Sequence, residues 1–224
     1  MRLIPGISLH WPGEMAQAQI MATDGKRLAE QFRYQHVHVN GWLDIGYHYV
    51  VAPDAKGNYH TYDGRPDWMT GAHSGTNWGN QHLGINVCYG SDLQKVPDQA
   101  LDETARLIAE LSKTYGFTIN AQTIRGHRDF IATQCPGTQL YASIPLLIRK
   151  AIQTKAEPRK PQEKPQGTEQ RHEEQLLRIK ANLAGQTVDA MLINSQSFIS
   201  AKDLVKLGFK VGWDKDKRIV NVSR

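Results

Sequence analysis

Long apolar runs are absent from this sequence of 224 residues, which argues against an integral membrane protein. No segment approaches the ~20 consecutive apolar residues that a membrane-spanning helix needs, so we expect no membrane partner. The first ten residues carry one arginine and only a short apolar run, which does not match a secretory signal peptide. We therefore expect synthesis in the cytoplasm without a signal peptide.

Cysteine is also scarce, since only Cys88 and Cys135 occur. A domain of this size does not need a disulfide to be stable, and disulfides persist mainly in oxidising compartments. We therefore expect both thiols to stay reduced. Cys88 falls in an apolar run and is most simply a small core residue. Cys135 falls in a predicted loop, where its thiol is free to bind a metal.

Most of the chain carries no net charge. Residues 1–174 contain 18 Lys/Arg and 18 Asp/Glu, whereas residues 175–224 contain 9 Lys/Arg and 4 Asp/Glu. A basic segment attached to a neutral body indicates attraction to an anionic polymer. Few aromatics, such as Phe209 and Trp213, stand among its basic residues, and no DNA- or RNA-binding motif occurs. We therefore expect no nucleic-acid partner.

Residues 154–174 lack Leu, Ile, Val and aromatic residues and contain three prolines. Such a segment cannot bury enough apolar surface to offset the entropy of ordering, so we predict an extended linker. It separates a main domain at residues 1–153 from a small basic module at residues 175–224.

Alternating and continuous apolar runs predict strands in the main domain, and amphipathic runs predict helices. The predicted strands lie near 3–9, 45–52, 59–62 and 83–89, and the helices at 26–38, 98–116 and 141–152. Asp98 is expected to cap the longest of these helices and Gly116 to end it. Strands interleaved with helices indicate an α/β domain with a mixed central β-sheet flanked by helices.

The basic module has a different pattern of apolar residues. We predict a strand at 187–193, a short helix at 200–207, and a hairpin formed by 209–213 and 218–222. This makes a small α+β C-terminal module.

The segment from Ile124 to Gly137 carries the strongest chemical signal. His127 and Cys135 lie eight residues apart around a loop, and Pro136 with Gly137 forms a turn after the cysteine. Zinc accepts imidazole and thiolate ligands, and a catalytic zinc keeps three protein ligands and one open position. The best third ligand is His10, because it ends the first apolar run and a strand can deliver it to a sheet edge.

The other histidines are assigned weaker roles. His48 follows Tyr47 in a predicted strand, so one of the two side chains can face a cleft while the other packs or is solvated. Five histidines are expected at the surface: His36, His38, His60, His82 and His172.

Further motifs accompany the predicted ligands, in order, over about 150 residues. They are Gly41-Trp42-Leu43-Asp44-Ile45-Gly46-Tyr47-His48-Tyr49-Val50, Gly64-Arg65, Gly71-Ala72-His73 with Asn77, Leu83-Gly84-Ile85, Gly126-His127-Arg128-Asp129 and Cys135-Pro136-Gly137. With His10, this series resembles the type 2 N-acetylmuramoyl-L-alanine amidases, a family that includes phage lysozyme-like amidases and peptidoglycan recognition proteins.

The resemblance implies a set of site residues. His10, His127 and Cys135 match the zinc ligands of the family, and Tyr47 matches the tyrosine beside the metal-bound water. Thr133 matches a position held by lysine or threonine, so any help to an oxyanion would be a neutral hydrogen bond. The loop with His73, Asn77 and Trp78 resembles the cleft wall that contacts the peptide stem, although Trp78 could instead pack beneath its loop. Arg65 is expected to serve the fold rather than the substrate.

The implied activity is hydrolysis of the amide between N-acetylmuramic acid and L-alanine in bacterial peptidoglycan, with Zn²⁺ as cofactor. The missing signal peptide favours a phage endolysin, made in the host cytoplasm and acting at the bacterial cell wall. The alternative is a recognition protein that binds peptidoglycan without cutting it. Such proteins commonly lose the cysteine ligand, which this chain keeps as Cys135.

The C-terminal module resembles the stalk-like domain found next to copper amine oxidases. The resemblance rests on Ser200-Ala201-Lys202-Asp203-Leu204, Lys210-Val211-Gly212-Trp213-Asp214 and Ile219-Val220-Asn221-Val222. Copper binding is not expected, because residues 175–224 contain no histidine. The basic charge and the neighbouring lytic domain predict instead that the module binds the cell wall, including its anionic polymers.

Overall fold

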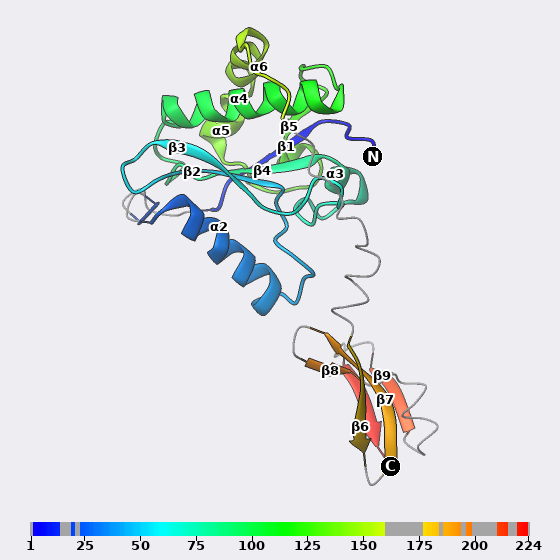
Figure 1. The fold of residues 1–224 in the computed structure, drawn as a ribbon. Helices are drawn as coiled ribbons and strands as arrows, with labels where there is room; N and C mark the ends of the chain where they lie inside the picture. The colour runs from blue at the N-terminus through cyan, green and yellow to red at the C-terminus, as the bar shows by residue number, and fades with distance from the viewer. Residues whose placement is uncertain are drawn as a thin grey trace. The chain divides into compact units, whose positions relative to one another are not determined.

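Four parallel strands and one antiparallel edge strand form the central sheet of the first unit (Figure 1). The computed structural model describes residues 2–13, 19–20 and 23–159, and the backbone of five strands in the C-terminal segment. The strands, in the sheet order β3-β2-β4-β1-β5, are β3 (Tyr59–Asp63), β2 (Tyr49–Pro53), β4 (Leu83–Val87), β1 (Ile7–His10) and β5 (Ile124–Gly126). The predicted mixed sheet is confirmed.

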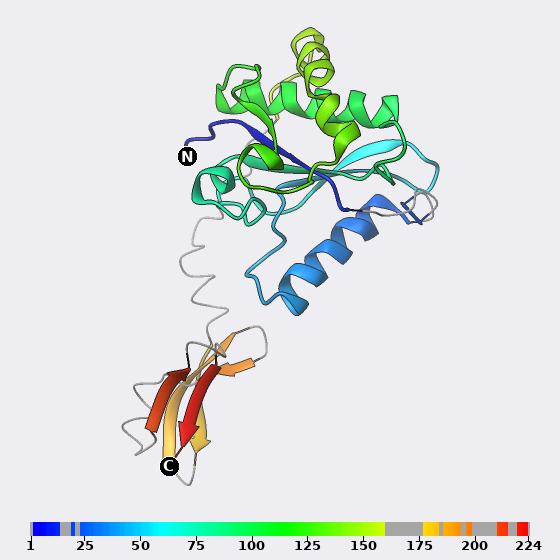
Figure 2. The same cartoon turned by 180° about the vertical axis from the view of Figure 1, so that it is seen from behind.

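One face of the sheet is apolar across its central strands β2, β4 and β1. The register places Leu9 beside Ile85 and Ile85 beside Tyr49, so these side chains share one face. Helices α4 (Asp98–Tyr115) and α6 (Ile144–Gln153) cover this face, and the short α5 (Thr138–Ala142) precedes α6 (Figure 1). Figure 2 shows the same layers from behind. This side of the sheet holds the larger hydrophobic core.

Helix α4 follows the expected amphipathic pattern, with one correction at its start. Gly116 ends it in the left-handed conformation at φ +74°, where glycine has no steric penalty. Asp98 is the first helical residue rather than the cap, because the cap position belongs to Pro97 and no side chain caps the helix. The carboxylate of Asp98 therefore acts on the helix dipole instead of on a backbone N–H.

The opposite face of the sheet is covered by helix α2 (Gly25–Tyr34), which continues into a π-helical turn at Gln35–Val39 (Figure 1). Its buried residues pack on a small apolar cluster that includes Val50 and Cys88. Ser8, His10 and Asn86 are buried polar residues of β1 and β4, and the register pairs His10 with Asn86. This face therefore changes from apolar to polar towards the end of β1, where a binding site can form.

The packed chain extends past residue 153, where the main domain was expected to end. Ala156 is buried, and its carbonyl accepts a hydrogen bond from the Lys113 ammonium. The Thr114 hydroxyl donates to the carbonyl of Arg159 over 2.8 Å, and the Arg159 guanidinium pairs with Asp63. The first compact unit accordingly runs to Glu163. These contacts are mostly polar and involve backbone carbonyls, so the pattern of apolar residues does not predict them.

The second compact unit covers Lys164–Arg224 and contains two small antiparallel sheets. Their strands are β6 (Leu177–Leu183), β7 (Gln186–Ile193), β8 (Gln196–Phe198), β9 (Lys210–Asp214) and β10 (Ile219–Ser223). The predicted strand at 187–193 and the predicted hairpin are present as β7 and β9–β10, whereas β6 and β8 were not anticipated. The predicted helix at 200–207 lies outside the described residues. Among those residues, no helix is long and apolar enough to cross a membrane.

Candidate metal centre

The three predicted ligands meet at one edge of the sheet. His10 is the last residue of β1, and His127 follows β5 directly. Because β1 and β5 are parallel neighbours, their carboxyl ends lie side by side. Cys135 returns from the following loop, and its Sγ lies 3.7 Å from Nδ1 of His10. One ligand atom from each residue lies within 4.8 Å of the others, which is close enough for a shared ion.

The loop that carries Cys135 is closed by its own backbone. The N–H of Arg128 donates to the carbonyl of Cys135 over 3.0 Å, which joins the two ends of the loop. Gly137 has φ +84°, and a Cβ there would lie 2.7 Å from the Tyr89 hydroxyl and from an Asp92 carboxylate oxygen. Only glycine therefore allows the chain to turn this closely behind the cysteine.

The donor set fits a transition metal such as zinc. Nε2 of His127 is buried without a hydrogen-bond partner, an arrangement that a metal bond would satisfy. Burial lowers the pKa of His10 and of His127, which keeps both imidazoles in the neutral form that binds metal. Burial raises the pKa of the Cys135 thiol to about 11, and a bound cation would ionise it. His10, His127 and Cys135 would supply the three protein ligands that catalytic zinc sites have.

Tyr47 lies beside the cluster, and its neighbour His48 points away from it. The Tyr47 ring centroid is 5.3 Å from that of His10. His48 is fully buried, and its Nδ1 accepts a hydrogen bond of 3.0 Å from the Gly84 N–H. His48 is therefore the packed side chain of the pair, and Tyr47 is the one that lies next to the candidate ligands. Burial raises the pKa of Tyr47, so its phenol stays protonated and has a proton to donate.

Arg65 holds the loop that presents Tyr47. Its buried guanidinium donates to the carbonyls of Asp44, Ile45 and Thr70 over 3.0, 2.7 and 2.7 Å. These bonds satisfy loop carbonyls that would otherwise be buried without partners. The structural role expected for Arg65 agrees with these contacts.

Thr133 lies within the loop that carries Cys135. Its Oγ1 accepts a hydrogen bond of 3.2 Å from the N–H of Cys135. A hydroxyl that accepts one bond can still donate its own proton. Thr133 thus binds the backbone N–H of Cys135, and its hydroxyl hydrogen is still available for donation.

The predicted cleft-wall residues separate into two groups. Asn77 and Trp78 are exposed on the short helix α3 (Asn77–Gln81), and Trp78 is 54% exposed, so it does not pack beneath its loop. His73 is buried, and its Nδ1 lies 3.0 Å from Nε2 of His10. His73 therefore lies behind the candidate ligand His10, and a contact of His73 with substrate stays a prediction. His82 was expected at the surface but is also buried, with its ring edge against Trp78.

Two polar residues of the site were missed in the sequence. Ser8 lies two positions before His10 on the same face of β1, and its Oγ is 2.9 Å from Nε2 of His10. Asn86 is fully buried, and both atoms of its amide lack a partner. The available signal was a polar residue inside an apolar strand, which is uncommon unless it serves a site.

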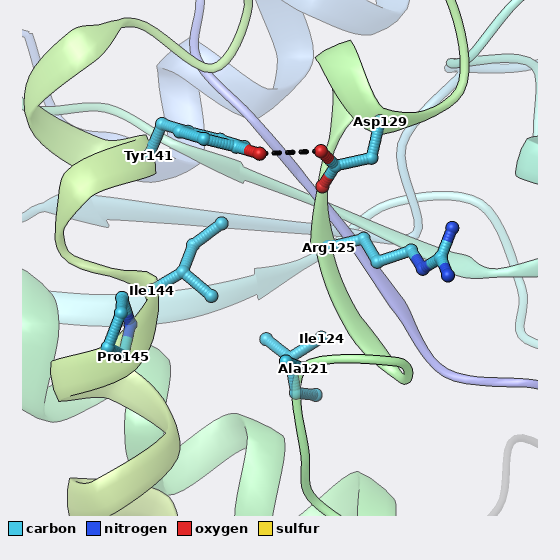
Figure 3. A pocket seen from close by; sticks show the side chains of 7 residues that line it. All are labelled: Ala121, Ile124, Arg125, Asp129, Tyr141, Ile144 and Pro145. Carbon is cyan, nitrogen blue, oxygen red and sulfur yellow. Dashed lines mark hydrogen bonds between the residues drawn. The ribbon is translucent and has the colours of Figure 1, made fainter.

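A separate pocket of about 450 Å³ lies along β5 and contains none of the three ligands (Figure 3). Its lining residues are Ala121, Ile124, Arg125, Asp129, Tyr141, Ile144 and Pro145. The Tyr141 hydroxyl donates to Asp129 over 2.7 Å, and Asp129 also accepts the Gly126 N–H over 2.8 Å. Asp129 thereby accepts a hydrogen bond from a backbone N–H of the edge strand β5. The aspartate of the Gly-His-Arg-Asp motif therefore has a structural role.

Two imidazoles and one thiol thus lie at the carboxyl edge of a mixed sheet in an α/β domain, with a phenol beside them. Zinc hydrolases use donor sets of this kind. Comparison with known proteins then identifies the family. The family model described as N-acetylmuramoyl-L-alanine amidase matches residues 3–138. The chain belongs to this family.

The relatives include both recognition proteins and lytic enzymes. Peptidoglycan recognition protein 1 of Bos taurus is 32% identical over 120 residues, 53% of this chain and 60% of that protein. Endolysin 2638A of Staphylococcus phage 2638A is 32% identical over 103 residues, 44% of this chain and 19% of that protein. The chain thus spans about three fifths of the recognition protein that it matches.

Among solved structures, a mutant of Drosophila PGRP-LB in complex with tracheal cytotoxin is similar, with a TM-score of 0.50 and 25% identity. The match covers 64% of this chain and 81% of that structure. It agrees with the α/β fold described above.

Proposed function

We propose that this protein is a zinc-dependent amidase that hydrolyses the bond between N-acetylmuramic acid and L-alanine of peptidoglycan stems, and that it acts as a lytic enzyme at the bacterial wall. The convergence of His10, His127 and Cys135 carries the proposal, because three ligands of this chemistry leave a position for reaction. The family supports the same bond as the target. The phage endolysin among the relatives supports the lytic role.

The residues around the cluster have separable roles in this proposal. Bound zinc supplies Lewis acidity, which polarises an amide carbonyl and lowers the pKa of water towards ~7. The protonated Tyr47 phenol donates a hydrogen bond that orients the attacking oxygen. The Thr133 hydroxyl donates to the carbonyl oxygen as negative charge develops there. The exposed Asn77 and Trp78 offer an amide and an aromatic face to the peptide stem.

Peptidoglycan is the proposed substrate because of what the relatives bind. The curated relative is named a recognition protein for peptidoglycan. PGRP-LB was solved with tracheal cytotoxin, a monomeric diaminopimelic acid-type peptidoglycan. The proposed scissile bond belongs to the same class of molecule.

Removal of the metal tests the proposal directly. The purified 224-residue chain should release L-alanine amino termini from isolated peptidoglycan, and a zinc chelator should abolish the release. Added zinc should restore it, because the protein ligands remain in place. Release that continues at full rate after complete removal of zinc, verified by metal analysis, would contradict the proposal.

A second candidate function is peptidoglycan recognition without cleavage, favoured by the recognition protein among the relatives. The same experiment separates the two. A recognition protein would sediment with peptidoglycan and release no amino termini, with zinc or without it. Retention of Cys135 beside both histidines favours the enzyme.

We also propose that the C-terminal module binds the wall through its charge, as its 9 Lys/Arg against 4 Asp/Glu in residues 175–224 would allow. The whole chain should sediment with wall material rich in anionic polymers more completely than a chain ending at residue 163. The difference should shrink as salt rises from about 0.05 to about 0.5 M, because screening shortens the range of charge attraction. Equal sedimentation of both chains at low salt would contradict the proposal that the C-terminal module binds the wall.

A further inference from the structure

The hydrogen bonds behind His10 form a chain with only one consistent arrangement of ring hydrogens. Nε2 of His73 lies 3.2 Å from the carbonyl oxygen of His82. A carbonyl oxygen only accepts, so Nε2 of His73 carries the hydrogen. Nδ1 of neutral His73 is then an acceptor, and it lies 3.0 Å from Nε2 of His10. Two lone pairs would repel at this distance, so Nε2 of His10 carries a hydrogen as well.

This arrangement decides which nitrogen of His10 is free. With the hydrogen on Nε2, the lone pair of His10 is on Nδ1. Nδ1 is the atom that lies 3.7 Å from Sγ of Cys135, on the side of the candidate metal site. Ser8 Oγ also contacts Nε2 of His10 over 2.9 Å, but a hydroxyl both donates and accepts, so it does not fix the ring by itself.

The His73 ring is held in place by the fold. A Cβ at either Gly71 or Gly84 would overlap the ring, so two glycines form the slot that contains it. The N–H of His73 donates to Oδ1 of Asn80 over 2.9 Å, which fixes the backbone as well. A ring that is confined in this way presents its acceptor to His10 at a constant position.

We propose that His73 is a positioning residue for the metal centre: it fixes His10 in the Nε2–H tautomer and directs Nδ1 to the ion. The inference rests on the proposed zinc site and adds a buried residue behind His10. An outer partner of this kind orients a ligand and raises its basicity, and its loss commonly weakens metal binding about 10–100-fold. The site is therefore preorganised before the metal arrives.

The tautomer can be read in the metal-free wild-type chain. Long-range ¹H–¹⁵N correlation spectra of the imidazole rings distinguish a protonated Nε2 from a protonated Nδ1. We expect the Nε2–H form for both His10 and His73, assigned by comparison with single variants. A His10 ring found in the Nδ1–H form in the wild-type chain would overturn the proposal.

Zinc affinity, measured by competition with a chromophoric chelator, gives the second test. His73→Leu removes the acceptor and should weaken binding about 10–100-fold. His73→Asn keeps an oxygen near the place of Nδ1 and should recover much of the loss. The matched control is His82→Ala, which removes another buried imidazole but keeps the backbone carbonyl that His73 uses.

The outcomes distinguish positioning from general damage to the fold. Equal affinity in His73→Leu and wild type would refute the role of His73, and so would equal losses in His73→Leu and His82→Ala. Tight zinc binding with the expected tautomers but no release of L-alanine termini would contradict the proposed amidase function and leave this inference standing.

Discussion

Replacement of Cys135 by serine is expected to remove zinc binding and amide hydrolysis together. Zinc prefers a thiolate to a neutral hydroxyl, and the serine hydroxyl does not ionise near neutral pH. Because the loss of an outer partner alone costs about 10–100-fold in affinity, the loss of a ligand should cost more than about 100-fold. Metal analysis after dialysis and the release of L-alanine termini measure the two effects separately.

The chain contains its own control for this experiment. Cys88 is the other cysteine, fully buried in the small apolar cluster beneath α2. Cys88→Ala should cost about 1–2 kcal/mol of stability through the small cavity that it leaves, yet keep zinc and activity. A Cys135→Ser protein that binds zinc like wild type and still hydrolyses peptidoglycan would refute the assignment of the ligand.

Replacement of Tyr47 by phenylalanine is expected to separate catalysis from metal binding. The ring would keep its contacts with His10, His36 and Phe32, so the site should keep its shape. Only the hydroxyl is lost, and with it the donor at the reacting atoms. Removal of one such donor typically lowers kcat about 10²- to 10³-fold. Zinc affinity and the melting temperature should stay close to those of wild type.

Tyr62→Phe provides the comparison, because Tyr62 packs against the same small apolar cluster as Tyr47, whereas its ring contact is with His60 and not with a ligand. Its kcat should be unchanged. A Tyr47→Phe enzyme with the kcat of wild type would remove the phenol from the mechanism. A variant that loses zinc instead would make Tyr47 a structural support of the metal site.

The sequence by itself predicted most of the local elements and all three candidate ligands. Apolar periodicity predicted most strands of the sheet and the long helix α4, because each element buries one face of fixed period. The pairing of His127 with Cys135 followed from their spacing around one loop. The motif series identified the family, which the family model confirms over residues 3–138.

Only the tertiary structure decided what surrounds those residues. His10 joins the other ligands because β1 lies parallel to β5, and strand order is set by how distant faces pack rather than by local pattern. The same packing places His73 behind His10, where two glycines leave room for its ring. It also holds residues 154–159 against the domain through backbone carbonyls and Arg159. Contacts of this kind join residues far apart in the chain, so local composition and periodicity do not predict them.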